Sequence, residues 1–243
     1  EKGKIFSKKK LLESEHRIAY ISKAKNSDKV LLRRMNFQTY GELEATDIAL
    51  RDLNMITDIN PQQAEYNWGT VEFTEWKAYD GQDMKGLLYK PEDFDSTKSY
   101  PLMVYFYETY TENKHAYYPP RATASIIYPT EYISNGYIVF IPDVNYEEGH
   151  PAKSAFNCIV SGSDALTRRH SWIDSTRMAL QGQSWGGYQT AQLVTMTTKY
   201  KAAMAGAPVS NMFSAYGGVR WGSGYSRMFQ YERGQSRIGF TIW

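Results

Sequence analysis

A Gly-x-Ser-x-Gly motif at residues 182–186 constrains this chain more than any other part of its sequence. The apolar run Met178–Leu180 leads into the motif, and a helical pattern follows it. A sharp strand-to-helix turn presents a reactive serine in this way, and its flanking positions must be small because β-carbons oppose the backbone twist. Ser184 is therefore predicted to be a nucleophile, and the Trp185 amide is predicted to point where an oxyanion forms. The predicted structural residues of the turn are Gly182, Gly186 and Gly187.

The pattern around the motif indicates an α/β fold. Continuous apolar runs at Leu102–Tyr107 and Tyr137–Ile141 are typical of strands that are covered on both faces of a mostly parallel sheet. Helical patterns cover Ala152–Arg169 and Thr190–Thr198, and Ala202–Ala207 is predicted to be another strand. Strand and helix alternate, which favours a doubly wound or hydrolase-type sheet.

The first sixty residues have a different pattern. Short apolar runs at Ile18–Ile21, Val30–Leu32 and Ile48–Leu50 are separated by turn-forming residues. This pattern predicts antiparallel strands. A hinge is expected at residues 60–63, Asn-Pro-Gln-Gln. Beyond it, residues 70–79 and 84–90 are predicted to form a hairpin around Asp80-Gly81.

Composition narrows the function classes. The net charge of +2 provides no general field for nucleic acid, so no nucleic-acid partner is expected. No segment approaches the roughly 20 uninterrupted apolar residues of a membrane-spanning helix. The sequence has no metal-ligand cluster and no phosphate-cradling loop, so neither a metal nor a cofactor is implied. The single cysteine, Cys158, lies in an apolar helix-like run and is predicted to be buried.

Two segments point to a known family. Gly182–Tyr188 and Ala207–Ser210 resemble the nucleophile motif and the following segment of the prolyl oligopeptidase family of serine peptidases, especially its dipeptidyl-peptidase branch. The resemblance implies a β-propeller that precedes an α/β-hydrolase domain. Residues 1–60 would then be the end of the propeller, and residues 61–243 would be a hydrolase domain that lacks its final strands.

The resemblance also implies roles for individual residues. Ser184 corresponds to the nucleophile, the Trp185 amide to one oxyanion donor, and the Tyr107 hydroxyl to the second donor. A core aromatic role is the alternative for Tyr107. The chain departs from the family after Tyr107, where Glu108-Thr109-Tyr110 replaces a glycine-rich step, and again after Asp143. The resemblance further implies an apolar substrate pocket formed by Trp185 and four later aromatic residues, Tyr216, Trp221, Tyr225 and Phe229. The alternative for these four is ordinary packing within a helical segment.

The partners of the serine are not evident in this sequence. In α/β-hydrolases the catalytic residues follow the chain order Ser, then Asp or Glu, then His. In this sequence no Asp or His follows Ser184, and Glu232 is the only acidic residue after it. The four histidines all precede the serine and are not expected to act as its base. We therefore expect the chain to be a fragment that is inactive by itself, with the Asp and the His beyond it.

Three functions remain open at this point. The leading one is a serine peptidase that cleaves short peptides after Pro or another small residue. A carboxylesterase would use the same turn, and a non-catalytic pseudo-hydrolase would have lost its base. A peptide substrate is the expected partner, and a homo-oligomer is an open alternative. The compartment stays open, and the resemblance to bacterial relatives, many of which are exported, makes a periplasmic or secreted location one of the alternatives.

Overall fold

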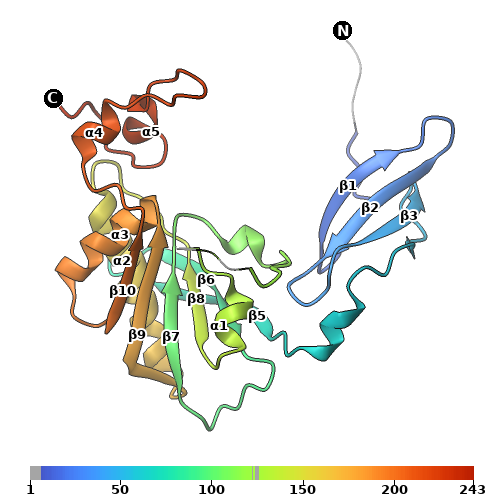
Figure 1. Cartoon of the computed structure of the whole chain (residues 1–243), viewed down its shortest axis with the longest axis horizontal. Coiled ribbons are helices and arrows are strands. Elements are labelled where there is room, and N and C mark those ends of the chain that lie inside the picture. The colour runs from blue at the N-terminus through green and yellow to red at the C-terminus, as the bar shows by residue number, and fades with distance from the viewer. Residues whose placement is uncertain (1–6, 122, 124–125) are drawn as a thin grey trace. The chain divides into compact units, whose positions relative to one another are not determined.

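The computed structural model describes residues 7–121, 123 and 126–243. The chain divides into two compact units, one with the residues up to 66 together with 115–117, and one with residues 67–114 and 118–243. Each unit has its own sheet (Figure 1). That the first unit is the end of a propeller stays a prediction.

The first unit is an antiparallel meander with the strand order β1-β2-β3-β4. Val30 and Leu32 on the second strand are buried, so one face of the meander carries a small apolar core. The expected strand at Ile48–Leu50 is wrong, because these residues form the turn after β3, where Leu50 has a φ of 54°. The elements are β1 (Arg17–Lys23), β2 (Lys29–Met35), β3 (Glu42–Asp47), β4 (Asn54–Met55) and the 3₁₀ helix η1 (Pro61–Glu65).

The second unit is built on a six-stranded sheet with the order β10-β9-β7-β8-β6-β5. Neighbouring strands pair in parallel from β10 through β9 and β7 to β8, whereas β6 pairs antiparallel with β8 and with β5. Strand β5 therefore runs in the same direction as these four, and β6 runs against them. The predicted hairpin around Asp80-Gly81 is confirmed, and Gly81 takes a φ of 87° in its turn. The strands are β5 (Thr70–Lys77), β6 (Asp83–Lys90), β7 (Tyr100–Tyr105), β8 (Ile138–Pro142), β9 (Ile173–Gln183) and β10 (Ala202–Gly206).

Helices cover both faces of this sheet. The two longest helices, α2 and α3, pack on each other, and α1 lies on the opposite face of the sheet (Figure 1). The connection from β7 through α1 to β8 runs in the opposite direction along the sheet to the connection from β8 through α2 to β9. Right-handed crossovers therefore place α1 and α2 on opposite faces. The helix predicted at 190–198 begins earlier, at Trp185, directly after the motif serine. The helical elements are η2 (Thr111–Asn113), α1 (Pro129–Ile133), α2 (Pro151–Arg169), α3 (Trp185–Met196), α4 (Met212–Tyr216) and α5 (Met228–Glu232).

The core of the second unit lies between the sheet and α2. Phe140 on β8 is fully buried, and its ring meets the Trp76 ring edge-on at 5.3 Å. Cys158 on α2 is fully buried, as predicted, and burial raises the pKa of its thiol to about 11. The same core includes Val104 on β7 and Leu180 on β9, near the carboxyl ends of these two strands.

Candidate active site

Ser184 forms the turn between β9 and α3. Its φ of 60° and ψ of −108° lie in a region that non-glycine residues avoid at a cost of about 1–3 kcal/mol. The turn is held by two main-chain hydrogen bonds, from Ser184 N to Gly206 O at 2.8 Å and from Tyr188 N to Ser184 O at 3.0 Å. Ser184 is half-buried, and within the described ranges its hydroxyl has no hydrogen-bond partner. The side chain is therefore presented rather than packed away.

The three glycines of the motif allow main-chain segments to approach each other closely. A β-carbon on Gly186 would lie 2.5 Å from the Phe106 carbonyl oxygen, and one on Gly187 would lie 2.6 Å from the Gly206 carbonyl oxygen. A β-carbon on Gly182 would collide with the main chain of Gly186. None of the three has a positive φ. The strained conformation therefore falls on the serine, and the glycines are needed for space.

Trp185 opens the first turn of α3 and is fully buried. Its indole ring stacks on the Tyr188 ring at 4.2 Å, and its Nε1 donates to the Tyr146 hydroxyl at 3.1 Å. The main-chain amides of a first helical turn have no acceptor within the helix. A contribution of Trp185 to a substrate site would therefore come from its main-chain amide and not from its side chain.

Tyr107 lies beside this turn, two residues beyond the end of β7. Tyr105 pairs with Gln181 in the parallel register of β7 and β9, which brings Tyr107 level with the serine turn. A β-carbon on Gly186 would lie 3.8 Å from Tyr107 Cδ2. The Tyr107 carbonyl oxygen accepts from Gln189 Nε2 at 2.9 Å, and its hydroxyl oxygen accepts from Gln235 Nε2. The structure therefore brings Tyr107, Ser184 and Trp185 together.

Hydrogen bonds connect the segment after Tyr107 with the segment that begins at Asp143. Asp143, which is buried at the end of β8, accepts from the amides of Tyr110 at 2.7 Å and Thr111 at 3.0 Å. Val144 N donates to the Glu108 carbonyl oxygen at 2.8 Å. The segment after Tyr107 is thus ordered by a carboxylate on the neighbouring strand end.

Tyr146 is a residue at this site that the sequence analysis missed. Its hydroxyl donates to the Tyr107 carbonyl oxygen at 3.0 Å, and it also accepts from the Trp185 indole. Burial raises the pKa of Tyr146, so the phenol stays neutral. The Arg237 guanidinium lies 5.1 Å from the Tyr146 ring centre and forms an ion pair with Glu108. With twenty tyrosines in the chain, no sequence signal marks this one.

The four aromatic residues of the expected substrate pocket have different environments. Tyr216 is buried, and its hydroxyl donates to Glu232, which is thereby engaged as an acceptor. Trp221 is 98% exposed, and Tyr225 and Phe229 are also exposed. Trp221 lines an open depression of about 450 Å³ together with Arg220 and Arg227. A pocket formed by all four side chains therefore stays a prediction.

The histidines occupy four separate places. His16 contacts Ser14 in the first unit, and His115 belongs to the same unit. His170 stacks on the Trp172 ring at 4.5 Å before β9 begins, and burial lowers its pKa. His150 directly precedes α2, makes no side-chain capping hydrogen bond and is exposed. Among the described residues, none of the four forms a hydrogen bond with Ser184.

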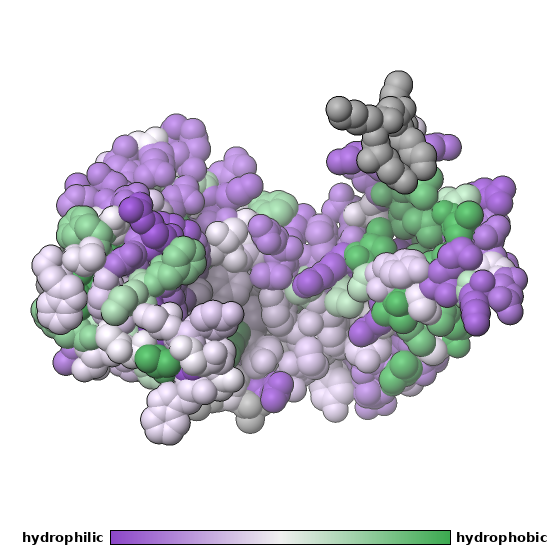
Figure 2. All heavy atoms as spheres, turned by 90° about the horizontal axis from the view of Figure 1, so that it is seen from above, coloured by the Kyte–Doolittle hydropathy of each residue, from purple (hydrophilic) through white to green (hydrophobic). Residues whose placement is uncertain are grey.

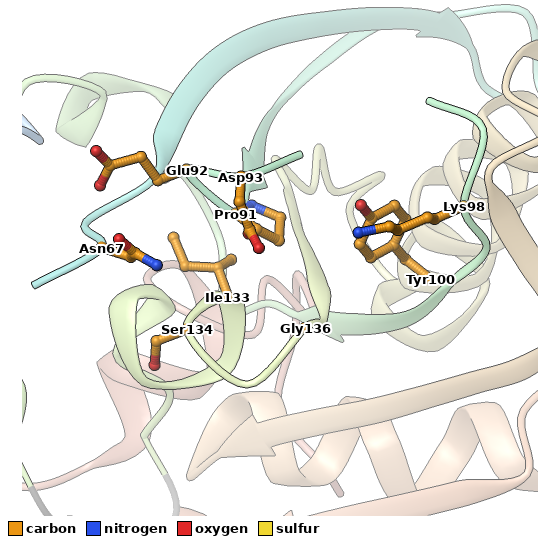
Figure 3. Close-up of a pocket in the computed structure, with 9 residues that line it drawn as sticks. All are labelled: Asn67, Pro91, Glu92, Asp93, Lys98, Tyr100, Ile133, Ser134 and Gly136. Carbon is orange, nitrogen blue, oxygen red and sulfur yellow. The ribbon is translucent and has the colours of Figure 1, made fainter. Parts of the chain in front are cut away.

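A separate cavity of about 240 Å³ opens at the end of the sheet where β7 begins (Figure 3). It is lined by Tyr100, which begins β7, by Ile133 on α1 and by the polar side chains of Glu92 and Lys98. Because Tyr107 follows the opposite end of β7, this cavity is not part of the serine site.

The described part of the chain has neither a metal-binding cluster nor a helix able to cross a membrane. No three His, Cys, Asp or Glu side chains in it gather in an arrangement that could hold a metal ion. None of the helices found in it has the length and apolar character needed to cross a membrane.

Comparisons with known proteins agree with this geometry. Residues 130–236 match the model of the prolyl oligopeptidase family. An uncharacterized peptidase of Bacillus subtilis, YuxL, is 26% identical over 159 residues, which cover 63% of this chain and 24% of that protein. Human dipeptidyl peptidase 8 is 25% identical over 190 residues, which cover 70% of this chain and 20% of that protein. The chain thus spans a quarter or less of these two relatives.

Solved structures share the fold. An acylaminoacyl peptidase of Pyrococcus horikoshii superposes with a TM-score of 0.71 at 15% identity, covering 96% of this chain and 37% of that one. Porphyromonas gingivalis dipeptidyl peptidase 4 gives a TM-score of 0.61 at 19% identity, with coverage of 84% and 30%. The predicted α/β-hydrolase fold is confirmed.

Proposed function

Because residues 130–236 match the model of the prolyl oligopeptidase family, we propose that the whole protein cleaves short peptides through an acyl-enzyme on Ser184. The observation that carries the proposal is the conformation of Ser184, a non-glycine residue with a φ of 60° between β9 and α3. Such strain persists where surrounding structure enforces it, and it is concentrated at reactive sites.

The chemistry follows from the groups around the turn. The Ser184 oxygen attacks the carbonyl carbon of the peptide bond while a base takes the hydroxyl proton. The developing oxyanion is stabilised by the Trp185 amide and the Tyr107 hydroxyl. One such donor contributes about 3–4 kcal/mol to transition-state stabilisation. The amine then leaves with a proton, and water hydrolyses the acyl-enzyme.

The base and its orienting acid are proposed to lie outside these 243 residues. No Asp or His follows Ser184 here, and the chain spans only about a fifth of human dipeptidyl peptidase 8. Loss of the base costs a serine hydrolase about 10⁶-fold in kcat. The isolated chain is therefore proposed to be inactive, and the full-length protein to be active.

Cleavage after Pro or another small residue is the proposed specificity. It is supported by the dipeptidyl peptidases among the relatives and by the aromatic segment from Tyr216 to Phe229. The names of the relatives favour a peptidase over a carboxylesterase.

The test uses the full-length protein, its Ser184→Ala variant and a fluorophosphonate probe. We expect the probe to label the wild-type protein at Ser184, as peptide mapping would show, and not to label the variant. Turnover of an Ala-Pro anilide should exceed that of a short-chain ester. Turnover of the ester alone would establish a carboxylesterase. A folded protein without labelling or turnover would establish a non-catalytic relative.

A further inference from the structure

We propose that three side chains, Arg220, Gln230 and Gln235, set the direction in which the Tyr107 hydroxyl donates its proton. The inference deepens the proposed function and rests on it, since it concerns the proposed oxyanion donor. The three residues are positioning residues, because they act through Tyr107 and do not touch the substrate carbonyl.

The side chains form a continuous series of hydrogen bonds that ends at Tyr107. Arg220 Nη2 donates to Gln230 Oε1 at 2.6 Å. Gln230 Nε2 donates to Gln235 Oε1 at 3.0 Å. Gln235 Nε2 then donates to the Tyr107 hydroxyl oxygen. The series links α5 and its two flanking segments to the residue beyond the end of β7.

The arginine determines the polarity of the whole series. A guanidinium has donors and no acceptor, so Gln230 must present its amide oxygen to Arg220. Its NH₂ group then faces Gln235, which must accept through its own oxygen. The NH₂ group of Gln235 is left to face Tyr107. Each amide orientation follows from the one before it.

The polarity has a consequence for the Tyr107 hydroxyl. Because its oxygen accepts from Gln235, its proton remains available to donate elsewhere, and within the described ranges no other group receives it. A donor on the phenol oxygen also polarises the O–H bond, which favours donation to an oxyanion. If Gln235 presented its oxygen instead, it would capture the proton.

The main chain of Tyr107 is held independently. Its carbonyl oxygen accepts from Gln189 at 2.9 Å and from Tyr146 at 3.0 Å. Replacing Gln235 therefore removes the constraint on the hydroxyl but leaves the constraints on the main chain. That separation allows the role of Gln235 to be tested without displacing the tyrosine.

The experiment compares Gln235→Glu with Gln235→Met in the full-length protein. The carboxylate has no N–H donor and accepts the Tyr107 proton, so we expect kcat to fall about 10²-fold, close to the effect of losing an oxyanion donor in Tyr107→Phe. The methionine sulfur is a much weaker acceptor than a carboxylate and leaves the proton free to donate, so kcat should fall about fivefold or less. KM should change little in both variants, and thermal unfolding verifies that both are folded.

The order of the two effects separates positioning from packing. If Gln235 served only to pack or to hold the segment, the apolar methionine would be at least as harmful as the glutamate, and that result would overturn the inference. A second readout is the Tyr107→Phe/Gln235→Glu double variant, which should be no slower than Tyr107→Phe alone. Additive losses would also overturn the inference. Failure of the proposed function would show differently, as absence of Ser184 labelling in the wild-type protein.

Discussion

At the residue scale, the proposed nucleophile is also a residue with backbone strain. Ser184 has a φ of 60°, and its amide and carbonyl groups are both engaged, with Gly206 O and Tyr188 N. Such a conformation costs about 1–3 kcal/mol in a residue with a β-carbon. The fold tolerates this cost at the residue whose hydroxyl is proposed to attack the substrate.

Replacing Ser184 by glycine should therefore stabilise the protein while abolishing activity. Glycine adopts positive φ without a steric cost, so we expect the free energy of unfolding to rise by about 1 kcal/mol. Urea denaturation followed by fluorescence measures the change. Ser184→Ala is the matched control, because it removes the hydroxyl and keeps the β-carbon. Equal stability of the glycine and alanine variants would show that the turn is not strained.

At the element scale, the site exists because β7, β9 and α3 meet at one edge of the sheet. The carboxyl ends of parallel strands lie together, so the residue after β7 falls beside the turn after β9. Contact is close because glycines line the first turn of α3, where the Phe106 carbonyl oxygen faces Gly186. The distance between these elements determines whether Tyr107 can act with the Trp185 amide.

Gly186→Ala should separate these elements. Its β-carbon would lie 2.5 Å from a main-chain oxygen that no side-chain rotation can move, so we expect a loss of stability of about 2–3 kcal/mol. Activity of the full-length protein should fall even where the variant is folded. Gly222→Ala is the control, because no atom lies within 4 Å of its added β-carbon. Equal urea midpoints for both variants would contradict the close contact.

At the scale of the whole molecule, two units each bury their own apolar side chains. Val30 and Leu32 are buried in the first unit, and Phe140 and Leu180 in the second. The surface of the first unit also carries exposed apolar residues, including Ile18, Ile21 and Met55. Green, hydrophobic areas are visible at the right of Figure 2, on the side of this unit. The two units are therefore expected to respond separately to core substitutions.

Hydrogen exchange on the full-length protein tests this separation. Leu32→Ala should reduce amide protection within residues 7–66, and Phe140→Ala should reduce it within residues 67–114 and 118–243, because each leaves a cavity that costs about 2–5 kcal/mol. The wild-type protein supplies the reference protection. Loss of protection in both units from either substitution would mean that they unfold together.

Most elements could be predicted from hydrophobic patterns. The runs at 102–107, 137–141 and 178–180 all fall in or next to β7, β8 and β9, and the Asp80-Gly81 turn is where the sequence indicated. Two details were missed. Residues 173–177 of β9 are largely polar and exposed, so no apolar run marks them. The apolar run at 48–50 forms a turn, because apolar character alone does not specify a strand.

The sequence by itself determined the nucleophile candidate, the glycines around it and the alternating fold, because these depend on local conformation and on the periodicity of burial. Only the tertiary structure decided which side chains reach that serine turn. Tyr146, Gln235 and Arg237 are far from Tyr107 along the chain. They reach its surroundings through hydrogen bonds, a cation–π contact and an ion pair with Glu108 that no local pattern encodes. Contacts between distant segments depend on strand order and register, which arise only when the sheet is assembled.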